Sequence, residues 1–85
     1  MGYKIEFTRR AVRDFESLPA VERRNLGRKI DALGANPRPD GVRKLRGAEG
    51  LYRIRTGDYR VIHSIADKKL LVLVILVGNR KDIYD

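Results

Sequence analysis

The chain of 85 residues contains no cysteine and no tryptophan, and it has a single histidine. Without cysteine, neither a disulfide nor a thiolate metal site can stabilise the fold, and one histidine among scattered carboxylates cannot build a metal site. No glycine-rich phosphate-binding loop is present. The longest apolar run, LLVLVILVG, is far shorter than the roughly 20 residues of a membrane-spanning helix. We therefore expect no metal, no cofactor and no membrane contact, and we predict a soluble, cytoplasmic protein.

Acidic residues are also in the minority, with 11 Asp and Glu against 19 Lys and Arg, which leaves a formal net charge of +8. Such a balance favours a polyanion or an acidic protein as partner. Arginine outnumbers lysine, and its guanidinium grips phosphate bidentately and stacks on bases. Many small proteins are basic without binding anything specific, so composition alone favours nucleic acid only slightly.

Length and the absence of a linker or repeat predict a single domain over residues 1–85. Residues 3–7 alternate apolar and polar side chains, as a half-buried strand does. Thr8 is expected to cap a first helix that ends at Pro19, and residues 20–34 predict a second helix antiparallel to it. The apolar positions at helical spacing are Ala11, Phe15, Leu18, Leu26, Ile30 and Leu33.

Beyond a loop that holds two prolines, the pattern changes to strands. The last of them is apolar at nearly every position, which predicts a central strand covered on both faces. The fold class is therefore α+β: an N-terminal strand and an antiparallel helical hairpin packed on one face of a small, mainly antiparallel sheet. The expected strands are residues 42–46, at an edge, 51–56, 58–66 and 69–77, and a tight turn at Asp67-Lys68 joins the last two.

Three arginines stand in the stretch LYRIRTGDYRVIHSI, which reads as a hairpin around a two-residue Gly57-Asp58 turn. That turn places Arg55 opposite Arg60. Because side chains alternate along strands, Arg53, Arg55 and Arg60 are expected on one solvent-facing side. The other side, packed against the helices, would hold Tyr52, Ile54, Tyr59, Val61 and His63.

Like charges directly opposite each other on a sheet are destabilising, by a few tenths to about 1 kcal/mol. We therefore favour a polyanion site over salt bridging to Asp58, Asp82 or Glu49, or simple solvation. A three-residue turn would instead separate Arg60 from the other two arginines. His63 is expected to fill an aromatic slot in the core rather than to act as a general base.

The segments KLRG, LYRIRTGDYRVIHSI and LVILVGNRKDIYD together resemble the RelE/ParE superfamily, the toxins of type II toxin–antitoxin modules. The resemblance covers essentially the whole chain and implies a microbial ribonuclease-like fold. On the RelE side it implies cleavage of messenger RNA in the ribosomal A site, by metal-free attack of the 2′-hydroxyl on the adjacent phosphate. The ParE side shares the fold but is associated with poisoning DNA gyrase.

Residue by residue, the resemblance implies that Arg60 holds the scissile phosphate, that Arg80 stabilises the transition state and protonates the leaving oxygen, and that Tyr84 orients the substrate base. Arg53 and Arg55 align with catalytic positions that are lysines in well-known RelE members. The general base is therefore not obvious, since arginine does not lose its proton in a protein; Tyr84 and Lys44 are the candidates. The expected RNA contacts are Lys44, Arg46 and Lys81.

Three hypotheses remain: a ribosome-dependent endoribonuclease toxin, which "NRKDIY" after the apolar strand favours, a gyrase-poisoning toxin without nuclease activity, and a non-catalytic RNA-binding module. Both toxin hypotheses imply a cognate antitoxin, acidic or amphipathic, in a hetero-oligomer. The expected contacts with the antitoxin or the ribosome are Arg23, Arg24, Arg28 and Lys29.

Overall fold

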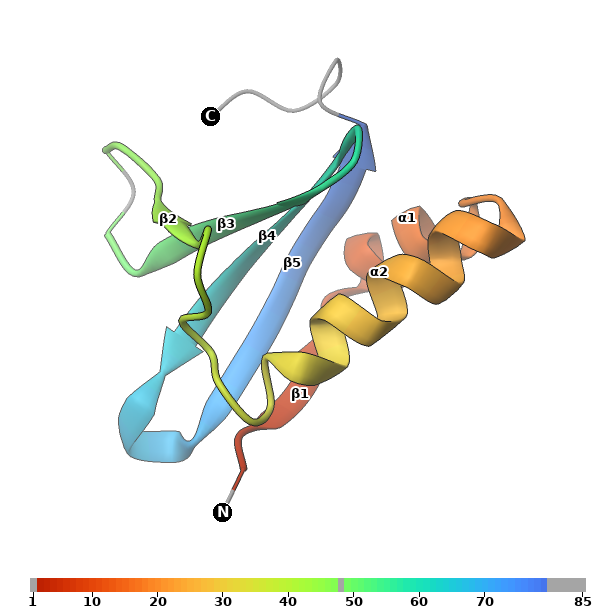
Figure 1. Ribbon diagram of the computed structural model, residues 1–85. Coiled ribbons are helices and arrows are strands. Elements are labelled where there is room, and N and C mark those ends of the chain that lie inside the picture. The colour runs from red at the N-terminus through yellow and green to blue at the C-terminus, as the bar shows by residue number, and fades with distance from the viewer. Residues whose placement is uncertain (1, 48, 80–85) are drawn as a thin grey trace.

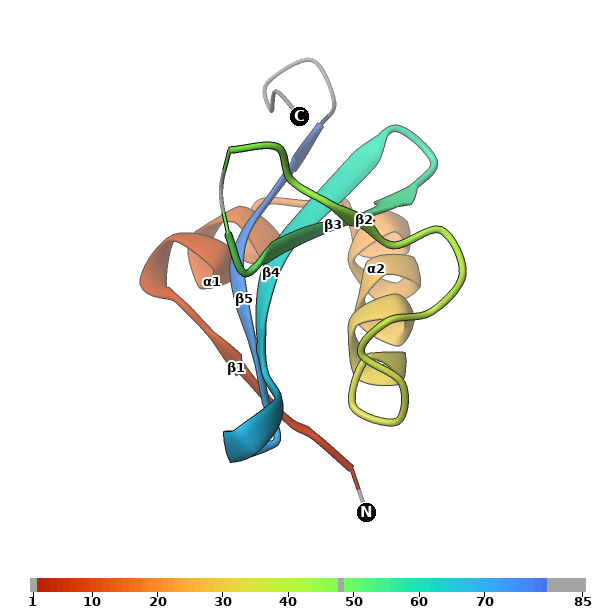
Figure 2. The same cartoon turned by 90° about the vertical axis from the view of Figure 1, so that its left-hand side faces the viewer.

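The computed structural model describes residues 2–47 and 49–79, which form a five-stranded sheet with two helices on one face (Figures 1 and 2). The strand order is β1-β5-β4-β3-β2; β1 runs parallel to β5, and the other neighbours are antiparallel. The predicted α+β class with a mainly antiparallel sheet is confirmed. The elements are β1 (Lys4–Phe7), α1 (Arg9–Glu16), α2 (Ala20–Ala32), β2 (Arg43–Lys44), β3 (Leu51–Thr56), β4 (Tyr59–Ala66) and β5 (Leu71–Asn79).

The two helices begin where the sequence predicts but end slightly earlier, α1 at Glu16 before Pro19 and α2 at Ala32 instead of residue 34. The Thr8 side chain accepts a hydrogen bond of 3.1 Å from the Ala11 amide, which satisfies one of the free donors at the start of α1. Pro19 immediately precedes α2. Arg23 donates to the carbonyls of Glu16 and Leu18, at 3.4 and 3.2 Å, and so satisfies free acceptors at the end of α1. Within the described residues, neither helix is long and apolar enough to cross a membrane.

The hydrophobic core lies between the helices and one face of the sheet. Leu26, Ile30 and Leu33 of the second helical segment are almost wholly buried, as their spacing predicted. They meet the inner side chains of the sheet, among them Val61 and Val74. The remaining buried members of this cluster are Ala11, Leu18, Ile54, Val72 and Val77.

The turn before β5 differs from the prediction. Asp67–Lys69 form one turn of 3₁₀-helix, and Leu70 then adopts a left-handed conformation with φ of 50°. The prediction of a tight turn at Asp67-Lys68 was therefore wrong, and β5 begins at Leu71 instead of residue 69. Contrary to the prediction, β5 is also not covered equally on both faces. Val72 and Val74 on its helix side are buried, whereas Leu73 and the neighbouring side chains on the outer face are only half-buried.

An irregularity in β5 changes the register of the sheet. Ile62 pairs with Leu76 and His63 with Val74, so Ile75 is an extra residue in β5, a β-bulge. The Thr8 hydroxyl donates to the Ile75 carbonyl at 2.6 Å. Because β5 consists almost entirely of apolar residues, no alternation in the sequence marks this position.

Candidate nucleic-acid interface

The hairpin of β3 and β4 has the predicted register. Gly57, with φ of 60°, and Asp58 form the turn, and Arg55 lies directly opposite Arg60. Arg53 lies opposite Ile62. Arg53, Arg55 and Arg60 therefore project from the same face of the sheet, away from the helices.

A fourth arginine joins them. Strand β2 pairs with β3 so that Arg43 lies opposite Arg53, and directly opposite residues share a face. We call Arg43, Arg53, Arg55 and Arg60 the arginine face. Arg43 was not among the predicted site residues, because the connection from β2 to β3 is not a short turn that fixes register. The only signal in the sequence was its place in the predicted edge strand.

The arginine face is graded in its exposure. Arg43 and Arg55 are exposed, Arg53 is half-buried, and Arg60 is buried, with only 9% of its surface accessible. The prediction that all three hairpin arginines face solvent was therefore wrong for Arg60. The reason is its position: β4 lies in the middle of the sheet, so Arg60 has β3 on one side and β5, at Gly78, on the other.

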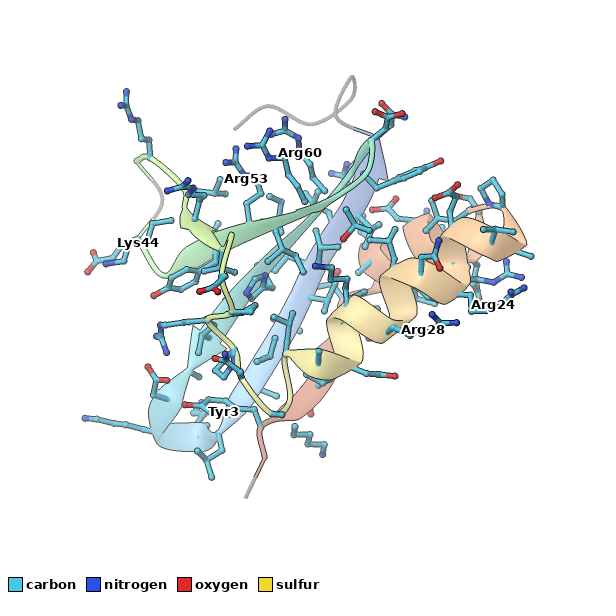
Figure 3. All side chains as sticks on the ribbon, viewed as in Figure 1. Tyr3, Arg24, Arg28, Lys44, Arg53 and Arg60 are labelled. Carbon is cyan, nitrogen blue, oxygen red and sulfur yellow. The ribbon has the colours of Figure 1, made fainter. Side chains whose placement is uncertain are left out.

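Figure 3 shows the side chains of Arg53 and Arg60 pointing the same way from the sheet. A buried guanidinium interacts with a phosphate more strongly than an exposed one, because less water screens the charges. Among the described residues, neither Asp58 nor Glu49 makes an ion pair with the arginine face. Asp82, the third carboxylate considered, lies outside the described residues.

Two of the predicted RNA-binding residues, Lys44 and Arg46, lie in β2 or shortly after it. Lys44 is opposite Tyr52 and so projects from the other face of the sheet than Arg43 does. Arg46 follows β2 and is exposed. A hollow of about 340 Å³ is lined by Arg43, Lys44, Leu45, Arg46 and Arg53.

Three predicted site residues, Arg80, Lys81 and Tyr84, lie outside the described residues. Strand β5 reaches Asn79, which is opposite Tyr59, and its Gly78 is opposite Arg60. Asn79, the last described residue of β5, is thus one position beyond the residue that lies opposite Arg60.

The basic residues of α2 fall into three groups that lie in different places. Arg24 and Arg28 are exposed and lie on the opposite side of the molecule from Arg53 and Arg60 (Figure 3). Lys29 is also exposed, but it lines a second hollow, of about 290 Å³, to which Arg43 and Arg55 contribute as well. Arg23 is half-buried and holds the end of α1.

His63 is wholly buried on the helix side of the sheet and stacks on Tyr52, with ring centroids 5.9 Å apart. Burial lowers its pKa, and the positive charge of Arg38 adds to this, whereas the Pro37 carbonyl acts in the opposite direction. His63 is separated by the sheet from the arginine face and cannot act there as a base. No group of three or more His, Asp or Glu residues within 2–47 and 49–79 is placed to hold a metal ion.

Comparison with known proteins agrees with this geometry. The sequence matches the family model of the ParE toxin of the type II toxin–antitoxin system parDE over residues 5–84. The chain belongs to the RelE/ParE superfamily of toxins. It is 34% identical over 83 residues to the mRNA interferase toxin RelE of Escherichia coli, a match that covers 95% of this chain and 86% of that toxin.

Solved structures of RelE proteins have the same fold as this toxin. The archaeal RelE–RelB complex from Pyrococcus horikoshii contains a chain with a TM-score of 0.83 and 32% identity, covering 98% of this chain and 100% of that one. The intact E. coli RelBE toxin–antitoxin complex contains one with a TM-score of 0.80 and 32% identity, covering 91% of this chain and 95% of that one.

Proposed function

We propose that this toxin is a metal-independent endoribonuclease that cleaves messenger RNA in the ribosomal A site, and that it acts in the cytoplasm as a single RelE-like domain. The observation that carries the proposal is the register of β2, β3 and β4, which gathers four arginines on one face with Arg60 buried at its centre. The name of the E. coli relative, an mRNA interferase, supports the same activity.

In the proposed reaction the 2′-hydroxyl of the message attacks the adjacent phosphate. The bond to the 5′-oxygen of the next nucleotide breaks, which leaves a 2′,3′-cyclic phosphate and a 5′-hydroxyl. Negative charge develops on the phosphorane, and preorganised guanidinium groups stabilise it without any metal. We assign phosphate binding to Arg60, with Arg53 and Arg55 as its electrostatic support. Arg80 stabilises the negative charge on the leaving 5′-oxygen by donating a hydrogen bond, and that oxygen then takes its proton from water, because the guanidinium does not lose its own.

The general base must be a group that can lose its proton, and no arginine can. His63 is buried on the wrong side of the sheet, and Lys44 projects from β2 away from Arg43. We therefore propose Tyr84, whose phenol would ionise more readily beside Arg60 and Arg80. Arg43, Arg46 and Lys81 bind phosphates along the message, and Lys44 does so from the other side of β2.

The proposed partners are the ribosome with its message and a cognate antitoxin. RelE relatives have been solved in complex with RelB antitoxins. Arg24, Arg28 and Lys29 present positive charge on α2, which an acidic, amphipathic antitoxin segment could neutralise in a toxin–antitoxin hetero-oligomer. Neutralising the arginine face as well would abolish binding to RNA.

Gyrase poisoning is the second candidate, because the matching family model is named for ParE. One experiment separates the two: purified toxin is added to programmed ribosomes and the 5′ ends of the message are mapped. Cleavage is expected, undiminished by EDTA, and Arg80→Ala should reduce its rate roughly a hundredfold. Lys68→Ala, which removes one charge from the exposed turn before β5, is the matched control and should cleave normally.

Cleavage by Arg80→Ala at the rate of the parent, or loss of cleavage in EDTA, would contradict the mechanism. An intact message together with DNA damage would identify a gyrase poison. An intact message without DNA damage would identify a passive RNA binder.

A further inference from the structure

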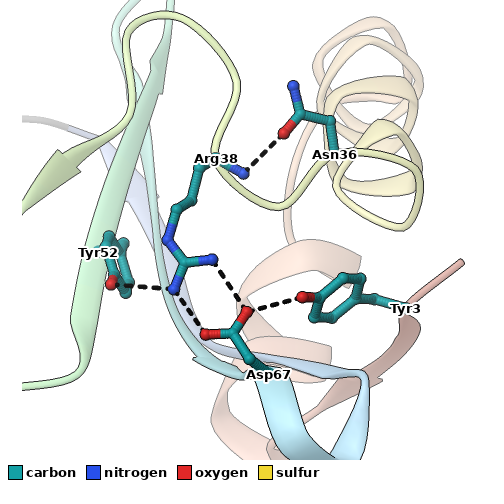
Figure 4. Close-up of polar contacts among 5 residues, drawn as sticks. All are labelled: Tyr3, Asn36, Arg38, Tyr52 and Asp67. Atoms are coloured by element: carbon teal, nitrogen blue, oxygen red, sulfur yellow. Dashed lines mark hydrogen bonds and ion pairs between the residues drawn. The ribbon is translucent and has the colours of Figure 1, made fainter.

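Arg38 connects distant parts of the chain on the helix side of the sheet (Figure 4). Its guanidinium forms two hydrogen bonds to the Asp67 carboxylate, of 3.0 and 2.9 Å, and it lies over the Tyr52 ring, 5.3 Å from the centroid. It also donates to the Tyr52 hydroxyl at 3.3 Å. Tyr3 donates to Asp67 at 2.6 Å. We call Arg38, Asp67, Tyr52 and Tyr3 the latch.

The latch fixes the loop that leads from α2 to β2. The Arg38 amide donates to the Asn36 side chain at 3.1 Å, and Pro37 is buried beneath the loop, with its carbonyl beside His63. His63 in turn stacks under Tyr52. The loop is therefore held from both sides, by a salt bridge at the surface and by packed rings below.

Strand β2 depends on this loop for its position. It consists of two residues, and among the described residues β3 is its one neighbour in the sheet. Lys44 of β2 lies opposite Tyr52, the same ring that Arg38 covers. On the far side of β2 the Leu45 amide donates to the Leu51 carbonyl at 3.0 Å. The latch is the tether on the N-terminal side of β2.

The latch contributes little to stability, because its ion pair is exposed. The Arg38 and Asp67 side chains are 42% and 54% accessible, and exposed ion pairs add little to the free energy of unfolding because water and salt screen them. Hydrogen bonds from Arg38 and Tyr3 lower the pKa of Asp67 to about 2, so the carboxylate keeps its charge in mildly acidic solution as well as at neutral pH. An exposed ion pair of this kind adds little to the stability of the core, but it can still fix the position of the short strand β2.

We propose that Asp67, through Arg38, is a positioning residue that holds the basic segment around β2, with Arg43, Lys44 and Arg46, in place to bind the RNA backbone. The proposal rests on the proposed function for the identity of the ligand. The latch does not touch the arginines assigned to the scissile phosphate, so its removal should weaken RNA binding and leave the chemical step unchanged.

Charge and positioning predict opposite changes in RNA affinity for Asp67→Asn. Asp67→Asn removes a negative charge from a basic protein, and by charge alone it should strengthen binding to a polyanion. Loss of positioning predicts the reverse. The matched control is Glu6→Gln, which removes a carboxylate that is paired at 3.5 Å with Lys4 on the outer strand β1. The control should bind RNA as well as the parent or slightly better.

The test measures the affinity of the full chain for a single-stranded RNA oligonucleotide at several NaCl concentrations. Asp67→Asn should bind about three- to tenfold more weakly, and the slope of log affinity against log salt should become shallower by about 0.7 for each phosphate that the variant no longer neutralises. A variant that is merely less folded would have fewer active molecules but an unchanged slope. Arg38→Lys keeps the charge without the bidentate fork and should behave like Asp67→Asn.

A double-mutant cycle shows whether the effect passes through β2. In a Lys44→Ala/Arg46→Ala background, most of the side chains that Asp67 positions are already missing, so Asp67→Asn should weaken binding little further. In the parent background, hydrogen exchange of the Leu45 amide should accelerate in Asp67→Asn, while exchange in the Val72–Val74 segment of β5 stays unchanged.

Equal or tighter RNA binding by Asp67→Asn, an unchanged salt slope, or full additivity with the β2 substitutions would each overturn the proposal. In ribosome assays the expected result is a raised KM with an unchanged kcat, and a lowered kcat with an unchanged KM would also overturn it. If the parent does not cleave messages but the cycle holds on the oligonucleotide, the proposed function fails and the positioning role stands.

Discussion

Arg55→Gln tests whether repulsion between the arginines of the arginine face lowers the stability of the fold while the same charges serve RNA cleavage. Arg55 is exposed and lies directly opposite the buried Arg60. Directly opposite residues have Cβ atoms about 5 Å apart, and two unit charges at about 6 Å would repel each other by about 0.7 kcal/mol in water, and more where water is partly excluded. Glutamine keeps most of the apolar stem of arginine but carries no charge. The substitution should therefore stabilise the fold by about 0.5–1 kcal/mol.

The assay is thermal and urea unfolding at low salt. For a domain of this size, about 0.7 kcal/mol corresponds to a rise in Tm of about 3–6 °C. The gain should disappear in 1 M NaCl, where the Debye length is only about 3 Å. Cleavage on programmed ribosomes should fall at least about tenfold in the same variant, so stability and activity should change in opposite directions.

Lys4→Gln is the control for this experiment. It removes one charge from an exposed strand residue whose paired charge, Glu6, is of opposite sign at 3.5 Å. Its stability should be unchanged or slightly lower, and its cleavage normal. An Arg55→Gln protein that is less stable than the parent at low salt, or whose stability gain persists in 1 M NaCl, would refute the reasoning.

Three further predictions concern pH, the end of β5 and the antitoxin. Burial lowers the pKa of His63 below its ordinary 6.5, so below that pH the unfolded chain takes up a proton that the folded chain does not. The free energy of unfolding should therefore fall as pH drops below 6.5. His63→Leu should remove this pH dependence, as measured by urea titrations. The Asp14 carboxylate accepts a hydrogen bond of 3.1 Å from the Val77 amide, so Asp14→Ala should lower the free energy of unfolding by about 1–3 kcal/mol, as measured by thermal unfolding. The control Arg10→Gln removes only the 3.5 Å ion pair to Asp14 and should lower it by less than about 0.5 kcal/mol. The association rate with the antitoxin should fall as NaCl rises, measured by stopped flow, and a rate insensitive to salt would contradict electrostatic steering.

Local patterns in the sequence predicted the order and type of the helices and strands and the register of the hairpin, but not every boundary. Thr8 and Pro19 mark helix ends by their chemistry, and the Gly57-Asp58 turn determines which residues face each other across β3 and β4. The burial of Arg60 was missed although the predicted turns already placed strand 58–66 between its two neighbours, as the structure does. Alternation assigns a side chain to a face, but its degree of burial depends on everything packed around it.

The latch and the bulge were missed for related reasons. Arg38 stands between two prolines in a loop, and no local rule pairs it with Asp67, which is 29 residues away along the chain. The extra residue Ile75 leaves no mark in a strand that is apolar throughout. Both features depend on contacts between segments that a window of sequence does not contain together.

The pairing of β1 with β5 has a consequence for how the chain reaches its folded state. The hydrogen bond from Thr8 to Ile75 joins residues that are 67 positions apart. Closing a loop of that length has an entropic cost of about 4 kcal/mol, beyond a constant, that only the finished sheet repays. Three core valines, Val72, Val74 and Val77, belong to β5, the last strand among the described residues. During translation the sheet therefore cannot close until β5 has been made, after all the other strands with which it forms the core.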